Sequence, residues 1–171
     1  MDFAVFATSL GWMAVAGSGS GILRVIMPRE SRDGAFAALM STVGVMPSLR
    51  ERGMTAFDSL PLRLVRFMQG WAVEFPDQVD TATWTPFRSR VWSATRLIPY
   101  GQTLSYGQVA ATIGQPRASR AVGQALHHNP VPVIVPCHRV IGADSSLTGF
   151  GSGIALKRAL LDMESAGRAT S

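Results

Sequence analysis

The chain has 171 residues, 47% hydrophobic and 16% charged, so it can bury a core and is too apolar to be disordered. No apolar run approaches the roughly 18 residues that span a bilayer, and Asp2 stands where a secretory signal would carry a base. Its single cysteine excludes an internal disulfide and the paired thiolates of most structural zinc sites. We therefore expect a compact protein of the reducing cytoplasm. We also predict that it uses no cofactor.

The net charge of +5 is divided unevenly along the chain. Residues 1–84 carry seven arginines against eight acidic residues, whereas residues 85–171 carry nine bases against three acidic residues. A basic surface attracts a polyanion, because each neutralised phosphate releases counterions. A GC-rich genome would also raise the arginine content, so charge alone favours a nucleic-acid partner only slightly.

Glycine turns divide the first segment into three short strands, expected at 3–7, 12–16 and 22–26. Ser31 is placed to cap a helix that runs to about residue 40, and a second helix is expected from Leu60 to Met68. Residues 43–58 show no clear period and are expected to be loop. Residues 76–84 have the composition of a linker.

Helix signals are sharper after residue 84. Thr85 and Pro86 form an N-cap followed by proline at the first helical position, and apolar residues follow at helical spacing. Ser105 and Gln108 fit a capping box that opens a short helix. A last amphipathic helix is expected over 153–165.

A helix expected over 118–128 follows the capping-box helix across a tight Gly/Pro turn. Arg117 and Arg120 lie near its start, so the pair fits a DNA-binding helix-turn-helix. An ordinary αα-hairpin within a core has the same pattern, and the two interpretations are equally good on pattern alone.

The only thiol, Cys137, follows a buried β-branched run at 131–135 and precedes His138. A lone cysteine is more often a small buried apolar residue than a nucleophile. A thiolate forms where a neighbouring base accepts its proton and the local field is positive, which the adjacent histidine and the basic half both favour.

The segment PCHRV at 136–140 resembles the active-site motif of the O6-alkylguanine-DNA alkyltransferases. Flanking segments agree in the family's order, namely TPF at 85–87, SY at 105–106, RAVG at 120–123, NP at 129–130 and LTGFG at 147–151. The resemblance covers residues 85–165. It implies an α/β (α+β) fold, with an N-terminal RNase H-like domain over 1–78, a linker over 79–84, and a mainly helical winged helix-turn-helix domain over 85–171.

The resemblance also implies the chemistry. An alkyl group would pass irreversibly from O6 of guanine, and also from O4 of thymine, to Cys137, once per molecule. His138 would act through a water molecule, and Glu164 would orient its imidazole. Tyr106 would donate a proton toward guanine N3, and Asn129 would hold the active-site turn. The plain alternatives are an exposed histidine, a solvated glutamate, a half-buried tyrosine and an asparagine that only ends a helix.

In the same family, backbone groups and an arginine handle the base. The carbonyls of Cys137 and Val140 would accept the exocyclic amine, and the Gly151 N–H would face O6. Pro132 and Phe150 would border the pocket together with the loop 143–151. Arg120 would fill the gap left by the flipped nucleotide, and the small residues near it would let the helix approach the minor groove: Ala118, Ser119, Ala121 and Gly123.

Three departures from the family are visible. Trp84 stands where glycine is common, and Phe150 stands where many members have tyrosine. The zinc site of some members cannot form, because its cysteines are missing and all three histidines lie in the second half.

The expected partner is double-stranded DNA that contains O6-alkylguanine. We expect the protein to bind it as a monomer and to have no membrane partner. The rivals are a lesion-binding protein without catalysis, a regulator with a sensing cysteine, and a cysteine hydrolase.

Overall fold

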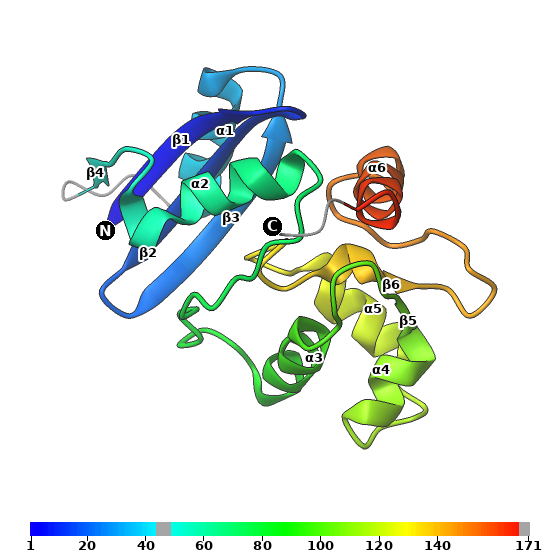
Figure 1. The fold of residues 1–171 in the computed structure, drawn as a ribbon. Helices are drawn as coiled ribbons and strands as arrows, with labels where there is room; N and C mark the ends of the chain where they lie inside the picture. The colour runs from blue at the N-terminus through cyan, green and yellow to red at the C-terminus, as the bar shows by residue number, and fades with distance from the viewer. Residues whose placement is uncertain (44–48, 168–171) are drawn as a thin grey trace. The chain divides into compact units, whose positions relative to one another are not determined.

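The computed structural model describes residues 1–43 and 49–167, which form two compact units divided between Ala82 and Thr83. The first unit holds the larger sheet and two helices, and the second is mainly helical (Figure 1). The expected mixed α/β class, a sheet combined with several helices, is confirmed.

The first unit is built on three antiparallel strands, β1 (Asp2–Thr8), β2 (Gly11–Ser18) and β3 (Gly21–Arg29). The three strands predicted from the glycine turns are therefore confirmed. Gly21 has φ +126°, and a Cβ there would lie 2.6 Å from the carbonyl oxygen of Gln78, so the turn requires glycine. A short strand, β4 (Arg50–Glu51), pairs parallel with β1, which gives the order β3-β2-β1-β4.

Helices cover both faces of this sheet. Helix α1 (Arg32–Val43) packs against β2 and β3, and helix α2 (Ala56–Met68) packs against β1. Alternate residues of a strand point to opposite faces, and the neighbours Phe3 and Ala4 are both buried. The prediction of loop over 43–58 was wrong at residue 43, which ends α1, and at residues 50–51, which form β4; residues 44–48 lie outside the described part. Phe57, Asp58 and Ser59 have left-handed backbone angles within α2, so its right-handed part runs from Leu60, where the helix was predicted to begin.

The predicted linker begins against the sheet. The Ile22 N–H donates to the carbonyl of Gln78 at 2.8 Å, and the Asp80 N–H donates to the carbonyl of Ile22 at 2.9 Å. Val79 between them is buried. The domain limits that we placed at residues 78 and 85 stay a prediction.

The second unit contains α3 (Pro86–Arg96), α4 (Tyr106–Thr112), α5 (Ser119–His127) and α6 (Ile154–Ser165). Strands β5 (Leu104–Ser105) and β6 (Val140–Ile141) pair in parallel. Both capping predictions are confirmed: the Thr85 hydroxyl accepts from the Arg88 N–H, and Ser105 and Gln108 form a reciprocal capping box.

Trp84 and Trp92 link the start of α3 to α5. The Trp92 indole donates to the carbonyl of Ala125 at 3.0 Å, and its ring lies edge-on to Trp84 with centroids 4.5 Å apart. Trp84, one of the departures from the family pattern, therefore contributes to the packing beneath α5.

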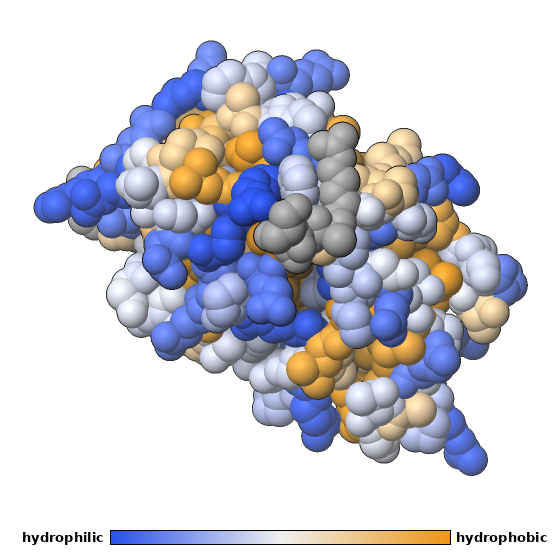
Figure 2. All heavy atoms as spheres, viewed as in Figure 1, coloured by the Kyte–Doolittle hydropathy of each residue, from blue (hydrophilic) through white to orange (hydrophobic). Residues whose placement is uncertain are grey.

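Among residues 1–43 and 49–167, no helix is long and apolar enough to cross a membrane. Figure 2 shows hydrophilic and hydrophobic residues intermixed on the visible face. The large apolar side chains that are substantially exposed come from separate elements: Leu10, Phe36, Leu62, Leu97 and Ile154.

Candidate active site

Cys137 begins a 3-10 turn, η1 (Cys137–Arg139), that leads directly into β6. The apolar run before it is buried, as predicted, and it folds back on itself: the Val135 N–H donates to the Val131 carbonyl at 2.9 Å. Val133 adopts φ +75°, a conformation that a β-branched residue adopts only where the surroundings hold it. This tight buried turn fixes the position of the thiol, which is only 6% exposed.

Asn129 holds that turn through three hydrogen bonds. Its Nδ2 donates to the Val135 carbonyl at 2.8 Å and to Sγ of Cys137 at 3.1 Å, and its Oδ1 accepts from the Val131 N–H at 3.0 Å. Asn129 follows the end of α5, so it also ends a helix. Its contacts extend well beyond that role, since one of them reaches the sulfur itself.

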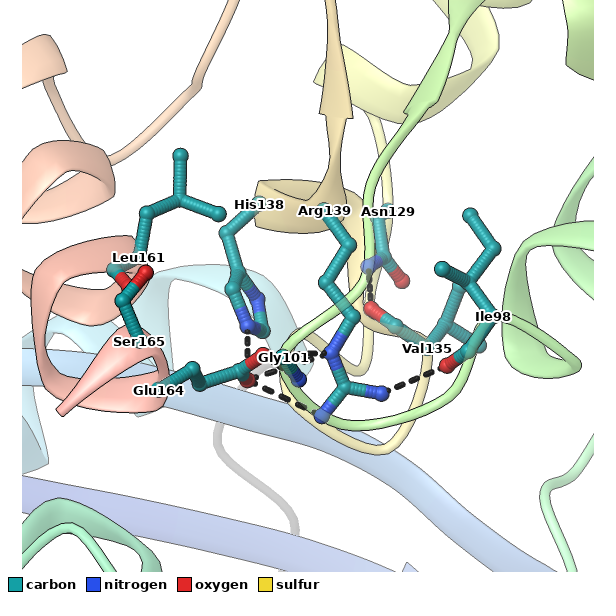
Figure 3. Close-up of polar contacts among 9 residues, drawn as sticks. All are labelled: Ile98, Gly101, Asn129, Val135, His138, Arg139, Leu161, Glu164 and Ser165. Carbon is teal, nitrogen blue, oxygen red and sulfur yellow. Dashed lines mark hydrogen bonds and ion pairs between the residues drawn. The ribbon is translucent and has the colours of Figure 1, made fainter. Parts of the chain in front are cut away.

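His138 is paired with Glu164 in the interior. The imidazole Nε2 lies 2.7 Å from Oε1 of Glu164, and both side chains are 1% exposed (Figure 3). The exposed histidine and the solvated glutamate that the sequence left open are therefore both wrong. The last turn of α6 thus places a carboxylate against the residue that follows the thiol.

Arg139 and Gly101 complete the surroundings of the carboxylate. The Arg139 guanidinium donates to both oxygens of Glu164 at 2.9 to 3.1 Å and to the carbonyl of Ile98 at 2.7 Å. The Gly101 N–H donates to Oε2 at 2.9 Å (Figure 3). A buried carboxylate needs such partners, because an unpaired charge in the interior is costly. The sequence analysis placed Arg139 in the PCHRV segment and among the bases of the second half, and assigned it no role of its own.

The charges of these groups follow from their surroundings. Burial raises the pKa of the Cys137 thiol, and the Asn129 hydrogen bond and the Lys157 charge offset only part of this rise. Burial lowers the pKa of His138, in spite of its bond to Glu164. Burial alone would raise the pKa of Glu164, but the hydrogen bonds from His138 and Arg139 outweigh it and lower the pKa. The resting state is therefore a thiol beside a neutral imidazole and an ionised glutamate.

Tyr106 lies at the start of α4, and its hydroxyl donates to the carbonyl of Thr148 at 2.6 Å. Burial raises its pKa, so the phenol keeps its proton at neutral pH. Its ring also faces α5, since a Cβ on Gly123 would lie 3.7 Å from it. The tyrosine is thus held between α5 and the loop that precedes α6.

Sequence reasoning missed Lys157, which is 1% exposed. Its ammonium donates to the carbonyls of Val140 at 2.6 Å and Thr148 at 3.1 Å, and to the Tyr106 hydroxyl at 3.4 Å. A signal was available, because Lys157 lies seven residues before Glu164 and three before the buried Leu160. This spacing places all three on one face of a helix.

The residues expected to contact DNA lie along the start of α5. Arg120 and Ala121 are exposed, and Ala118, Ser119 and Gly123 are partly buried. Helices α4 and α5 pack against each other across the turn that contains Arg117, which is also exposed. The two short helices are confirmed, and both arginines remain available to a partner.

The residues expected to border the base pocket differ in burial. Pro132 and Val140 are buried, and Phe150 is 9% exposed. Gly151 is exposed, and a Cβ there would lie 3.1 Å from the carbonyl oxygen of His127, so a larger residue would require that carbonyl to shift slightly. Among residues 1–43 and 49–167, no group of three or more His, Cys, Asp or Glu side chains is placed to hold a metal ion.

Comparison with known proteins gives the class first. Residues 86–166 match the family model described as 6-O-methylguanine DNA methyltransferase, DNA binding domain. In the solved structure of Mycobacterium tuberculosis O6-methylguanine methyltransferase, 37% of aligned residues are identical, with a TM-score of 0.76 over 99% of this chain and 96% of that one. For the structure of M. tuberculosis OGT in complex with DNA, the identity is 35% and the TM-score is 0.73, over 97% of this chain and 94% of that one.

Two curated relatives agree with this. The methylated-DNA–protein-cysteine methyltransferase of Mycobacterium leprae is 40% identical over 155 residues, which is 91% of this chain and 87% of the relative. That of M. tuberculosis H37Rv is 51% identical over 109 residues, 64% of this chain and 66% of the relative, just under two thirds of its length. The chain belongs to the methylated-DNA–protein-cysteine methyltransferase family.

Proposed function

We propose that the chain repairs DNA by moving an alkyl group from O6 of guanine to Sγ of Cys137, once per molecule. One observation carries this proposal. A single turn presents a thiol hydrogen-bonded to Asn129, and next to it His138 is bonded to the buried Glu164. Membership of the family supports the same reaction.

The reaction needs a proton acceptor, a nucleophile and a proton donor. The thiol proton of Cys137 passes through a water to the neutral imidazole of His138, and Glu164 stabilises the resulting cation. The sulfur forms a bond to the alkyl carbon while the carbon–O6 bond breaks. The electron pair of the broken carbon–O6 bond stays on the guanine. Tyr106 donates its proton toward N3 of guanine, and the proton that the thiol released later returns to the Tyr106 oxygen. In sum, the thiol proton replaces the alkyl group on the base.

The base reaches the thiol by leaving the duplex, at a cost on the order of a few kcal/mol. Arg120, exposed near the start of α5, fills the gap and bonds the orphaned partner base. The carbonyls of Cys137 and Val140 accept the exocyclic amine, and the Gly151 N–H faces O6. Alkylated O4 of thymine is a second substrate.

The thioether formed on Cys137 is a far poorer leaving group than a thiolate, so the reaction ends after one transfer. A cysteine hydrolase would instead turn over. We place this chemistry in a winged helix-turn-helix domain over 85–171, preceded by an RNase H-like domain over 1–78 and a linker over 79–84. The protein acts as a monomer in the cytoplasm.

The test is mass spectrometry of the protein after incubation with a duplex that contains one O6-methylguanine. We expect one methyl group on the Cys137 peptide and a yield that stops at one per protein. Multiple turnovers would point to a hydrolase. Tight binding with an unmodified Cys137 would point to the lesion-binding alternative.

Cys137→Ser is the matched control for this experiment. The variant should bind the methylated duplex as the parent chain does and transfer nothing, because a serine hydroxyl beside a neutral imidazole is a much weaker nucleophile. Transfer by this variant would overturn the assignment of Cys137.

A further inference from the structure

Two of the groups assigned above to the guanine already have partners within the protein. The Val140 carbonyl accepts from the Lys157 ammonium at 2.6 Å, and the Tyr106 hydroxyl donates to the Thr148 carbonyl at 2.6 Å. The Tyr106 hydroxyl has one proton, so it cannot donate to the base while it donates to Thr148, and the Lys157 ammonium occupies one of the two lone pairs of the Val140 carbonyl. The entering guanine must therefore displace the bond of Tyr106, and it must displace or share the bond that Val140 accepts.

Lys157 lies at the centre of this arrangement. An ammonium has three N–H donors and no acceptor, and Lys157 has three acceptors: the carbonyls of Val140 and Thr148 and the oxygen of Tyr106. The side chain is 1% exposed, so these bonds replace its hydration. Its own helix supplies none of the three acceptors. Lys157 therefore connects β6, the loop before α6 and the start of α4.

We propose that Lys157 is a positioning residue whose ammonium takes the place of the guanine exocyclic amine on the Val140 carbonyl until a base enters. This rests on the proposed function. On entry, the amine of guanine takes over that carbonyl, and the Tyr106 hydroxyl leaves Thr148 for N3. Lys157 keeps Thr148 and moves off Val140, which prevents a buried carbonyl from losing its partner at any stage.

A placeholder role for Lys157 predicts a difference between substrates that simple packing would not produce. A base without the exocyclic amine, O6-methylhypoxanthine, leaves Lys157 on Val140, so that carbonyl stays satisfied. The parent chain should therefore repair the two bases at similar rates. Without the ammonium, the carbonyl depends on the amine of the base, and discrimination should appear.

The experiment compares single-turnover transfer from two duplexes, one with O6-methylguanine and one with O6-methylhypoxanthine, in the parent chain and in Lys157→Met. Methionine keeps much of the length of the side chain and removes the donors. We expect the ratio of the two rates to rise by about five- to tenfold in Lys157→Met, the factor for one hydrogen bond. Lys157→Arg should return the ratio toward the parent value.

Leu160→Met serves as the matched control, because Leu160 lies on the same face of α6 and is fully buried. It should leave the ratio unchanged whatever it does to stability. Equal slowing of both substrates in Lys157→Met would overturn the inference and leave Lys157 only a charge near Cys137. Absence of transfer by the parent chain on both duplexes would overturn the proposed function itself, and this inference with it.

Discussion

The Gly101 N–H donates to Oε2 of Glu164 at 2.9 Å, so the turn after α3 is tied to the last turn of α6 by the same carboxylate that bonds His138. Gly101 has φ +72°, which suits glycine. The carboxylate thus joins two segments more than sixty residues apart in the sequence. Its loss should affect both stability and chemistry.

Glu164→Gln should destabilise the protein and slow transfer. Gln cannot balance the buried guanidinium of Arg139, and breaking a buried ion pair costs about 3–5 kcal/mol. Loss of the carboxylate also removes the group that stabilises the protonated His138, so we expect transfer to slow by about a hundredfold. Chemical denaturation and single-turnover transfer check the two effects.

Asp162→Asn is the control for this variant, because Asp162 lies on the same helix and is exposed. It should alter the free energy of unfolding by no more than about 0.5 kcal/mol. Equal behaviour of the two variants would contradict the role given to Glu164.

Stability should fall on the acid side. The pKa of His138 is lowered in the folded state from an ordinary 6.5, so below that pH the unfolded chain binds a proton that the folded chain does not. The pKa of Glu164 is lowered from 4.5 and acts with the same sign at lower pH. The free energy of unfolding should therefore be highest above 6.5 and decrease as the pH falls through this window.

Denaturation by urea across this pH range measures the effect. Transfer should keep its neutral-pH rate below 6.5, since the folded His138 is still neutral there. A rate that falls with an ordinary imidazole titration would contradict the buried, neutral histidine. His138→Gln should remove the part of the pH dependence of the free energy of unfolding that His138 contributes.

Asn129→Ala should destabilise the turn and make the Cys137 thiol less reactive at neutral pH. Three hydrogen bonds disappear, and we expect a loss of about 1–3 kcal/mol in the free energy of unfolding. The bond to Sγ lowers the pKa of Cys137, so without it the pKa should rise further and reaction with iodoacetamide at neutral pH should slow. Gln124→Ala, on the exposed side of α5, is the control. Faster reaction of the Asn129 variant would mean that Asn129 shields the sulfur.

Arg120→Ala should separate base extrusion from chemistry. Transfer from free O6-methylguanine base should be unchanged, whereas transfer from duplex DNA should slow by about ten- to a hundredfold, since extrusion costs a few kcal/mol. Arg117→Ala is the matched control, because that residue is also exposed, lies just before α5 and carries the same charge. Equal losses on base and duplex for Arg120→Ala would contradict the base-flipping role.

Local signals predicted the helices of the second unit well. Thr85, Pro86 and the Ser105–Gln108 capping box satisfy backbone groups within one turn, and such signals need no tertiary context. The turn before Cys137 could not be predicted in this way, because Val133 adopts a left-handed conformation that only the surrounding contacts stabilise.

Buried charges were the other limit of prediction. Helical spacing places Lys157 on the same face as Leu160, and Arg139 lies in the PCHRV motif, but neither signal identifies their partners. Their burial depends on carbonyls and a carboxylate that distant segments supply. Glu164 was found through the resemblance to a family, and its burial among three donor groups was not. The site therefore needed the structure wherever its partners lie far apart in the chain.

The tryptophan pair of the second unit offers an optical readout without any label. Trp92 bonds the backbone of α5 through its indole N–H, and Trp84 lies against its ring. The chain's other two tryptophans, Trp12 and Trp71, belong to the first unit. When α5 engages a duplex, the emission of this pair should change in wavelength or intensity, so intrinsic fluorescence can follow docking in real time, before any covalent change at the sulfur.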